Sequence, residues 1–144
     1  MTDRGFTHIA LTVRDAGASR SFYEHYGALS LVDERVDSTT DRRVVWLDDG
    51  RRPFLLVLIE AEKVVPLQPI SHLGFACPSR AEVDRLCDDA KGDDVLVSGP
   101  EDYGPPVGYW ALIRDPDGHT IEISYGQDTE IASHNSTHRH SGAA

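Results

Sequence analysis

The sequence has few of the residues that mark secreted, membrane-bound or nucleic-acid-binding proteins. Its two cysteines, Cys77 and Cys87, are too few for a disulfide framework and do not form a Cys-x-x-Cys pair. No apolar run approaches the roughly 18–20 residues of a membrane-spanning helix, and the first residues lack the pattern of a signal peptide. Against 24 Asp and Glu stand 14 Lys and Arg, and a net charge of −10 disfavours nucleic acid and anionic membranes as partners. We therefore expect a reduced, cytoplasmic protein.

What is present is an internal repeat. Residues 7–13 (THIALTV) and residues 71–77 (SHLGFAC) both read as strands, and each has a histidine at its second position, 64 residues apart. A helix is predicted after each: Ala16–Tyr26 behind Asp15 as its cap, and the stretch from Arg80 behind a Ser79 capping box. Three strand-like runs follow each helix. They are Leu29–Val36, Arg43–Leu47 and Phe54–Ile59 in the first half, and Val95–Ser98, Tyr109–Arg114 and Thr120–Tyr125 in the second.

The 144 residues thus read β-α-β-β-β twice, which predicts an α+β fold. We place one domain over residues 5–126, with modules at 5–60 and 69–126. Each module of about 60 residues is marginal alone, so the modules or two chains must share a core. The tail, 127–144, has no periodicity and is expected to be mobile or laid on the surface; its His134, His138 and His140 are interpreted as solvated.

Strand alternation places three side chains on faces with small neighbours. His8 shares a face with Ala10 and Thr12, and His72 shares one with Gly74 and Ala76. In DPDGHTIEI (115–123), a type I turn leads into a strand on which Glu122 lies opposite two isoleucines. A glutamate there ordinarily faces water. The matched histidines favour a different interpretation, in which Glu122 is turned inward as a ligand.

Two imidazoles and one carboxylate form a donor set for Fe(II), Zn, Mn, Co or Ni, with positions open for a substrate. His8, His72 and Glu122 are therefore the predicted metal ligands. No cofactor other than a divalent metal is expected. No residue can be assigned from the sequence as a catalytic base.

The paired modules, the two histidines and DPDGHTIE resemble the vicinal-oxygen-chelate superfamily, which includes glyoxalase I, extradiol dioxygenases and bleomycin-binding proteins. The resemblance implies two modules forming an open-barrel metal cup with the helices outside, in a homodimer. It also implies a metal that chelates vicinal oxygens of a small-molecule substrate. In such a dimer, one chain supplies His8 and its partner supplies His72 and Glu122.

The residues do not match any one subfamily of this superfamily in full. Aligning Gly50 with Gly118 places Leu56 opposite Glu122, which leaves three ligands and departs from glyoxalase I; a register slip could instead present Glu60 as a fourth. The three-ligand relatives have a tyrosine ten residues before the glutamate, where this chain has Leu112.

The substrate pocket is assigned to four aromatic residues. Tyr103 stands in a loop that reads equally as a lid or a plain hairpin, and Tyr109 and Trp110 follow it. Trp46 and Trp110 read either as pocket or as core residues. His25 and His119 are expected on the surface.

The leading interpretation is a metal-dependent enzyme, an isomerase or lyase of the glyoxalase or epimerase type or a dioxygenase. The alternative is a binding protein that sequesters an antibiotic or metabolite, as bleomycin-resistance proteins do. The retained ligand set favours the enzyme, because a sequestering groove does not need it.

Overall fold

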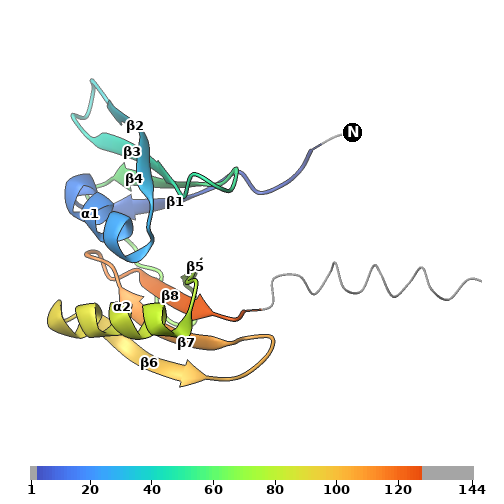
Figure 1. Cartoon of the computed structure of the whole chain (residues 1–144). Coiled ribbons are helices and arrows are strands. Elements are labelled where there is room, and N and C mark those ends of the chain that lie inside the picture. The colour runs from blue at the N-terminus through green and yellow to red at the C-terminus, as the bar shows by residue number, and fades with distance from the viewer. Residues whose placement is uncertain (1–2, 128–144) are drawn as a thin grey trace, which may run out of the picture. The chain divides into compact units, whose positions relative to one another are not determined.

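The computed structural model describes residues 3–127, and its elements occur in the order β-α-β-β-β twice (Figure 1). Module one contains β1 (His8–Val13), α1 (Ala16–Tyr26), β2 (Ser30–Val36), β3 (Arg43–Asp48) and β4 (Leu55–Glu60). Module two contains β5 (Leu73–Ala76), α2 (Arg80–Gly92), β6 (Leu96–Asp102), β7 (Tyr109–Arg114) and β8 (Thr120–Tyr125). The predicted order is confirmed, although β5 is shorter than expected and β6 longer. The prediction for the tail falls on residues 128–144, outside the described residues.

Each module forms its own four-stranded sheet. The strand order is β1-β4-β3-β2 in the first and β5-β8-β7-β6 in the second. The first strand of each module pairs in parallel with the last, β1 with β4 and β5 with β8. The identical order shows that the sequence repeat is a structural repeat, and the fold is α+β with two open sheets.

The chain divides into two compact units that do not coincide fully with the modules. Within the described residues, unit 1 comprises 3–72 and 114–120, and unit 2 comprises 73–113 and 121–127. The turn between β7 and β8 is thus grouped with module one, although both strands belong to module two. No helix in residues 3–127 is long and apolar enough to cross a membrane.

Helix α1 begins and ends where its caps predict. The Asp15 carboxylate accepts hydrogen bonds from the amides of Gly17 (2.8 Å) and Ala18 (3.1 Å), and Gly27 is the C-cap. The helix packs against β3 and β4. Its buried residues are Ala16, Ser19, Phe22, Tyr23 and Tyr26. Ala18, although apolar, is exposed.

Helix α2 places its apolar stripe as predicted. Ser79 caps it by accepting from the Glu82 amide at 3.1 Å, and Val83, Leu86, Cys87 and Ala90 are buried. Burial raises the pKa of Cys77 to about 11 and also raises that of Cys87, so both thiols stay protonated at neutral pH. This supports the interpretation of both as reduced packing residues.

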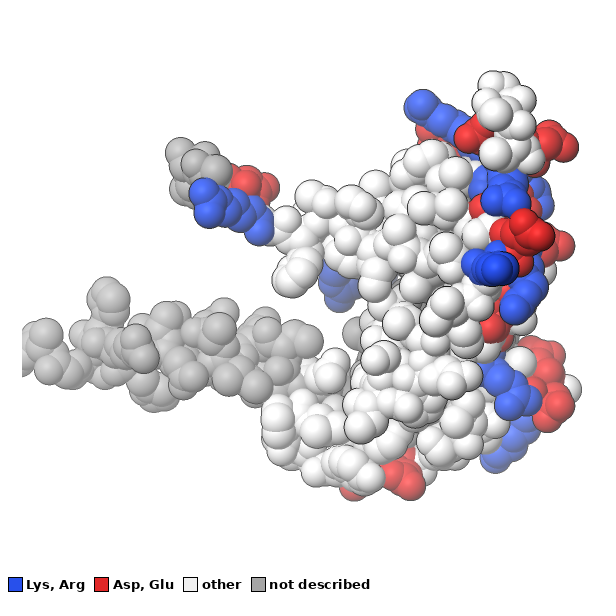
Figure 2. Space-filling view, turned by 180° about the vertical axis from the view of Figure 1, so that it is seen from behind, with Lys and Arg blue, Asp and Glu red and all other residues white. Residues whose placement is uncertain are grey.

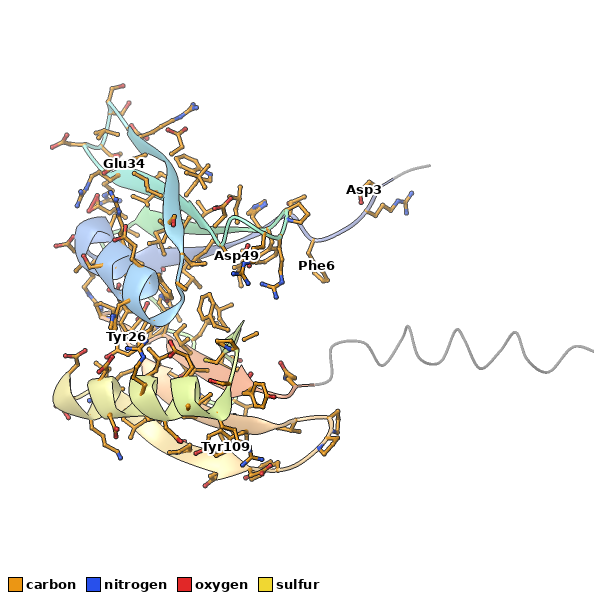
Figure 3. All side chains as sticks on the ribbon, in the orientation of Figure 1. Asp3, Phe6, Tyr26, Glu34, Asp49 and Tyr109 are labelled. Atoms are coloured by element: carbon orange, nitrogen blue, oxygen red, sulfur yellow. The ribbon has the colours of Figure 1, made fainter. Side chains whose placement is uncertain are left out.

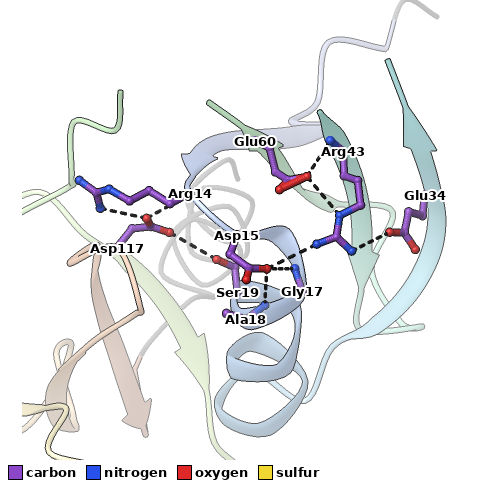
Figure 4. Close-up of polar contacts among 9 residues, drawn as sticks. All are labelled: Arg14, Asp15, Gly17, Ala18, Ser19, Glu34, Arg43, Glu60 and Asp117. Atoms are coloured by element: carbon purple, nitrogen blue, oxygen red, sulfur yellow. Dashed lines mark hydrogen bonds and ion pairs between the residues drawn. The ribbon is translucent and has the colours of Figure 1, made fainter. Parts of the chain in front are cut away.

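Charged side chains of opposite sign are interspersed on the face shown in Figure 2, beside a broad uncharged area. One such group joins four elements of module one. The Arg43 guanidinium lies 3.1 Å from Glu60, 3.4 Å from Glu34 and 3.4 Å from Asp15 (Figure 4). These contacts hold the start of β3 beside the end of β4 and the start of α1.

Gly108→Ala should destabilise the protein strongly. Gly108 has a φ of +85°, and an added Cβ would lie 2.8 Å from the Gly126 carbonyl carbon and 2.9 Å from the Gln127 nitrogen. Gly104 has a φ of +66° but nothing within 4 Å of an added Cβ. Gly104→Ala should therefore lower the free energy of unfolding by only about 1 kcal/mol, because of backbone strain. Gly108→Ala should lower it by about 2 kcal/mol more, because its new Cβ also clashes with the backbone. Urea unfolding of both variants measures the difference, and equal losses would contradict it.

Candidate functional site

The two faces of β1 differ as the residue pattern predicts. Leu11 and Val13 are buried, whereas His8 and Ala10 on the opposite face are exposed. The imidazole of His8 lies with its Nδ1 2.8 Å from the Thr7 hydroxyl. His8 is thus on the side of the sheet that the hydrophobic core does not occupy, with a small residue next to it on that face.

Glu122 is buried, with 9% of its surface exposed. It pairs in register with Gly74 on β5, so the two share a face, and Ile121 and Ile123 are fully buried on the other. An added Cβ on Gly74 would meet nothing within 4 Å, which leaves open space on this face. The polar face of β8 is thus not open to water, because Thr120 and Ser124 on the same face are also buried.

His72 comes immediately before β5 and is exposed. Its Nδ1 lies 2.6 Å from the Ile70 carbonyl oxygen. A carbonyl only accepts hydrogen bonds, so Nδ1 carries the proton and the lone pair is on Nε2. This is the tautomer that metal-binding histidines commonly adopt, with the second nitrogen donating to a carbonyl.

The three predicted ligands are divided between the two compact units. His8 and His72 belong to unit 1, and Glu122 belongs to unit 2. Among residues 3–127, no three His, Cys, Asp or Glu side chains are placed to hold a metal ion. Their assignment as a ligand set stays a prediction.

The register of β1 and β4 shows which residue of module one corresponds to Glu122. Ala10 pairs with Val57, as Gly74 pairs with Glu122, so the matching residue is Val57 and the alignment that gave Leu56 is wrong by one position. Glu60 pairs with Val13 and lies on the face opposite His8. Glu60 also accepts hydrogen bonds from the Arg43 amide (2.7 Å) and side chain. It is therefore not placed to join His8 as a fourth ligand.

Two of the predicted pocket residues lie on the non-helical faces of their sheets. Trp46 pairs with Val57 and so shares the face of Ala10 and His8. Trp110 lies opposite the buried Ala111 on β7, and its ring packs edge-on against Tyr103 with 5.2 Å between centroids. The buried Trp110 Nε1 finds no hydrogen-bond acceptor among the described residues.

Tyr109 points the other way, towards α2. Its hydroxyl donates to Asp84 at 2.5 Å, and the Arg80 guanidinium lies 4.7 Å from its ring centroid (Figure 3). Both partners belong to α2, so we leave Tyr109 out of the proposed pocket.

The Asp115–His119 turn contains three buried polar side chains, those of Asp115, Asp117 and His119. The Gly118 amide donates to the Asp115 carbonyl at 3.0 Å, which closes the predicted turn. The Asp115 carboxylate accepts from the Tyr23 hydroxyl at 2.7 Å and from the amides of Asp117 and His119. Burial raises the pKa of this carboxyl and, together with the nearby Asp115, that of Tyr23.

Asp117 fixes the same turn to the start of α1. Its carboxylate accepts from the amide (3.0 Å) and guanidinium (3.1 Å) of Arg14 and from the Ser19 hydroxyl (3.4 Å), as Figure 4 shows. The turn was expected from sequence, but its burial was not.

His119 is 1% exposed, so its expected surface position is wrong. Its Nδ1 accepts a hydrogen bond from the Leu67 amide at 2.9 Å, and its Nε2 lies 2.8 Å from the Thr12 carbonyl oxygen. Because Nδ1 accepts, the proton is on Nε2, which donates to Thr12. The ring is thus neutral and both nitrogens are used. His25, by contrast, is exposed on α1 as expected.

Comparison with known proteins assigns the family. Residues 5–123 match the model of the Glyoxalase/Bleomycin resistance protein/Dioxygenase superfamily. The chain belongs to this superfamily. An uncharacterised protein of Pseudomonas aeruginosa is 36% identical over 125 residues, covering 84% of this chain and 88% of that protein.

Two solved structures support the fold of this superfamily member. A possible glyoxalase from Bacillus cereus is 28% identical with a TM-score of 0.64, covering 85% of this chain and 99% of its own. A mutant of the fosfomycin resistance protein FosX from Listeria monocytogenes has a TM-score of 0.71 at 19% identity, covering 92% and 99%. That structure is a complex with Mn(II) and 1S,2S-dihydroxypropylphosphonic acid. The span that the family model covers, residues 5–123, contains His8, His72 and Glu122.

Asp115→Asn should change how the stability of this superfamily member depends on pH. Burial raises the pKa of Asp115 above its ordinary 3.8. At a pH between 3.8 and the pKa that Asp115 has in the folded protein, the folded state binds more protons than the unfolded state. The contribution of Asp115 to stability is therefore lost as the pH rises through the folded-state pKa. Asparagine does not ionise. The stability of the wild type relative to Asp115→Asn should therefore fall as pH rises from about 4 to 8, measured by urea unfolding.

Asp49, in the equivalent turn of module one, provides the control, because its pKa is shifted in the opposite direction. The amides of Arg52 and Arg51, and the Arg52 side chain, lower its pKa. The contribution of the Asp49 carboxylate to stability is present above pH 3.8, its ordinary pKa. It is lost as the pH falls through the lower pKa that Asp49 has in the folded protein. The advantage of the wild type over Asp49→Asn should thus shrink on acidification. The same sign for both variants would contradict the assignment.

Proposed function

We propose that this superfamily member is a cytoplasmic, divalent-metal-dependent enzyme. His8, His72 and Glu122 would bind the ion, and a small substrate would bind through two adjacent oxygens. The observation that carries the proposal is the inward position of Glu122 beside Gly74, in a chain that places one histidine at the start of each module. Three protein ligands leave coordination positions for two substrate oxygens.

The residues around these positions fit such a site. The Nδ1 bond of His72 to Ile70 places the lone pair on Nε2, where a metal is commonly bound. Ala10 and Gly74 leave room beside the ligand-bearing strands. Val57, at the position that matches Glu122, cannot bind a metal, which supports three ligands rather than four. When bound, the ion would act as a Lewis acid on a substrate oxygen.

The aromatic residues would form the wall of the pocket. Trp46 lies on the face of His8, and Trp110 offers its Nε1–H as a donor to a substrate oxygen. This combination suits a compact, oxygen-rich molecule with an apolar part. The chemistry would be of the isomerase or lyase type, or that of a dioxygenase. A sequestering protein of the bleomycin-resistance type would bind its ligand without turnover, so assays with methylglyoxal hemithioacetal and catechols distinguish the two.

His8→Ala and Glu122→Ala should each weaken metal binding at least about 100-fold, because each removes one of three ligands. Mn(II) is the first ion to test, since the Listeria relative of this fold was solved with it. Isothermal titration and elemental analysis of desalted protein measure the loss. His25→Ala removes an exposed histidine on α1 and is the matched control, with affinity unchanged. Equal affinity in all four proteins would refute the ligand set.

We also infer that the protein acts as a homodimer with shared sites. Each module is an open four-stranded sheet, and the face of module one that carries His8 also exposes Ala10 and Ile59. A second copy related by twofold symmetry would cover this face and enlarge the shared core. His8 would then come from one chain and the other two ligands from its partner.

Mixing His8→Ala chains with Glu122→Ala chains should restore metal binding in the heterodimer. Each single variant lacks a ligand in both sites, whereas the mixed dimer contains one intact site and one that lacks two ligands. Metal content after purification through two different affinity tags should approach one ion per dimer. Confirmed subunit exchange with no recovered binding would show that each chain supplies a whole site.

A further inference from the structure

We propose that His119 is a positioning residue for the ligand set, because its hydrogen bonds join the chain segments that lead to all three ligands. This inference rests on the proposed metal function. The three segments are β1 with His8, the connection between β4 and β5 that ends at His72, and the start of β8 before Glu122. His119 itself would not touch metal or substrate.

The first connection is to β1. This strand lies at the edge of its sheet, and the Thr12 carbonyl on it accepts the Nε2–H of His119 at 2.8 Å. Thr12 is four residues beyond His8 and lies on the same face of the strand. A strand is stiff along its length, so anchoring Thr12 limits how far β1 slides or tilts, and His8 with it.

The second connection is to the segment before His72. The Leu67 amide donates to His119 Nδ1 at 2.9 Å, and the Leu67 carbonyl accepts from the Thr120 amide at 2.7 Å. Leu67 is thus fixed on both its polar groups by consecutive residues, His119 and Thr120. Thr120 in turn shares a strand face with Glu122, two residues on.

A metal site is sensitive to such anchoring. Ligand distances are held to about 0.2 Å, and a working site needs its groups within about 0.5 Å. A shift of that size in an anchoring segment is therefore enough to weaken metal binding. In a dimer with shared sites, each His119 would act on both sites, since it holds ligands that its chain contributes to each.

Two conservative variants separate the two connections. Asparagine places its amide oxygen near the position of Nδ1, so His119→Asn can accept from Leu67 but does not reach Thr12. Glutamine places its amide nitrogen near Nε2, so His119→Gln can donate to Thr12 and loses Leu67. Both should weaken Mn(II) binding at least about tenfold, as expected for a residue that orients ligands. Amide hydrogen exchange at Leu67 should quicken in His119→Gln only.

Tyr23→Phe is the control for a purely structural role. It removes a buried hydrogen bond to Asp115 in the same turn and leaves both hydrogen bonds of the His119 ring in place. It should lower Tm as the His119 variants do and leave Mn(II) affinity within about twofold. If the His119 variants bind Mn(II) as well as Tyr23→Phe does, the positioning role is overturned and the proposed function stands. A wild type that binds no divalent metal overturns both.

Replacing a buried ring can unfold a chain, so a second experiment tests the same hydrogen bond without changing His119. Leu67→Pro deletes the amide that donates to Nδ1 and keeps the bond of Nε2 to Thr12. Weakened Mn(II) binding in the folded variant is the expected result. Unchanged affinity would count against the proposal.

Discussion

The Asp115 carboxylate accepts three hydrogen bonds inside unit 1, from the Tyr23 hydroxyl and from two amides of its own turn, with only 3% of the residue exposed. Taking a carboxylate out of water costs several kcal/mol, and bonds to a charged group return about 1.5–3 kcal/mol each. The raised pKa of Asp115 shows that burial still outweighs its partners. The turn is therefore stable only where Tyr23 and α1 surround it. Everything that follows it in β8, including Glu122, starts from that anchored point.

The equivalent turn of module one shows what local sequence alone produces. Asp49 accepts from the amides of Arg51 and Arg52 in a similar local pattern, yet it remains near the surface (Figure 3) and its pKa is lowered. The same turn chemistry thus gives opposite pKa shifts. The difference comes from burial, which raises the pKa of Asp115 although the Tyr23 hydrogen bond lowers it. This asymmetry within a repeat is matched in the sheets, where Glu122 and Val57 occupy corresponding positions.

Local signals account for what the sequence could predict. Period-two alternation, helix caps and the 64-residue repeat gave the element order, the helix boundaries and the inward face of Glu122. Long-range contacts account for the rest. The burial of His119 depends on Thr12, 107 residues earlier, and no local pattern encodes such a contact. The match of Glu122 to Val57 depends on pairing across β1 and β4, which an alignment of turns through the extra residues 51–53 missed by one.

The strand pairing also limits how the proposed site can be divided between chains. Gly74 and Glu122 are paired neighbours on β5 and β8 of one chain, and His72 directly precedes β5. His72 is thus joined by the chain directly to the strand that pairs with the strand of Glu122. His8 stands on a separate sheet, with no strand pairing between the two sheets in the described residues. In the shared arrangement proposed above, the partner would supply His8, the ligand on the sheet of module one.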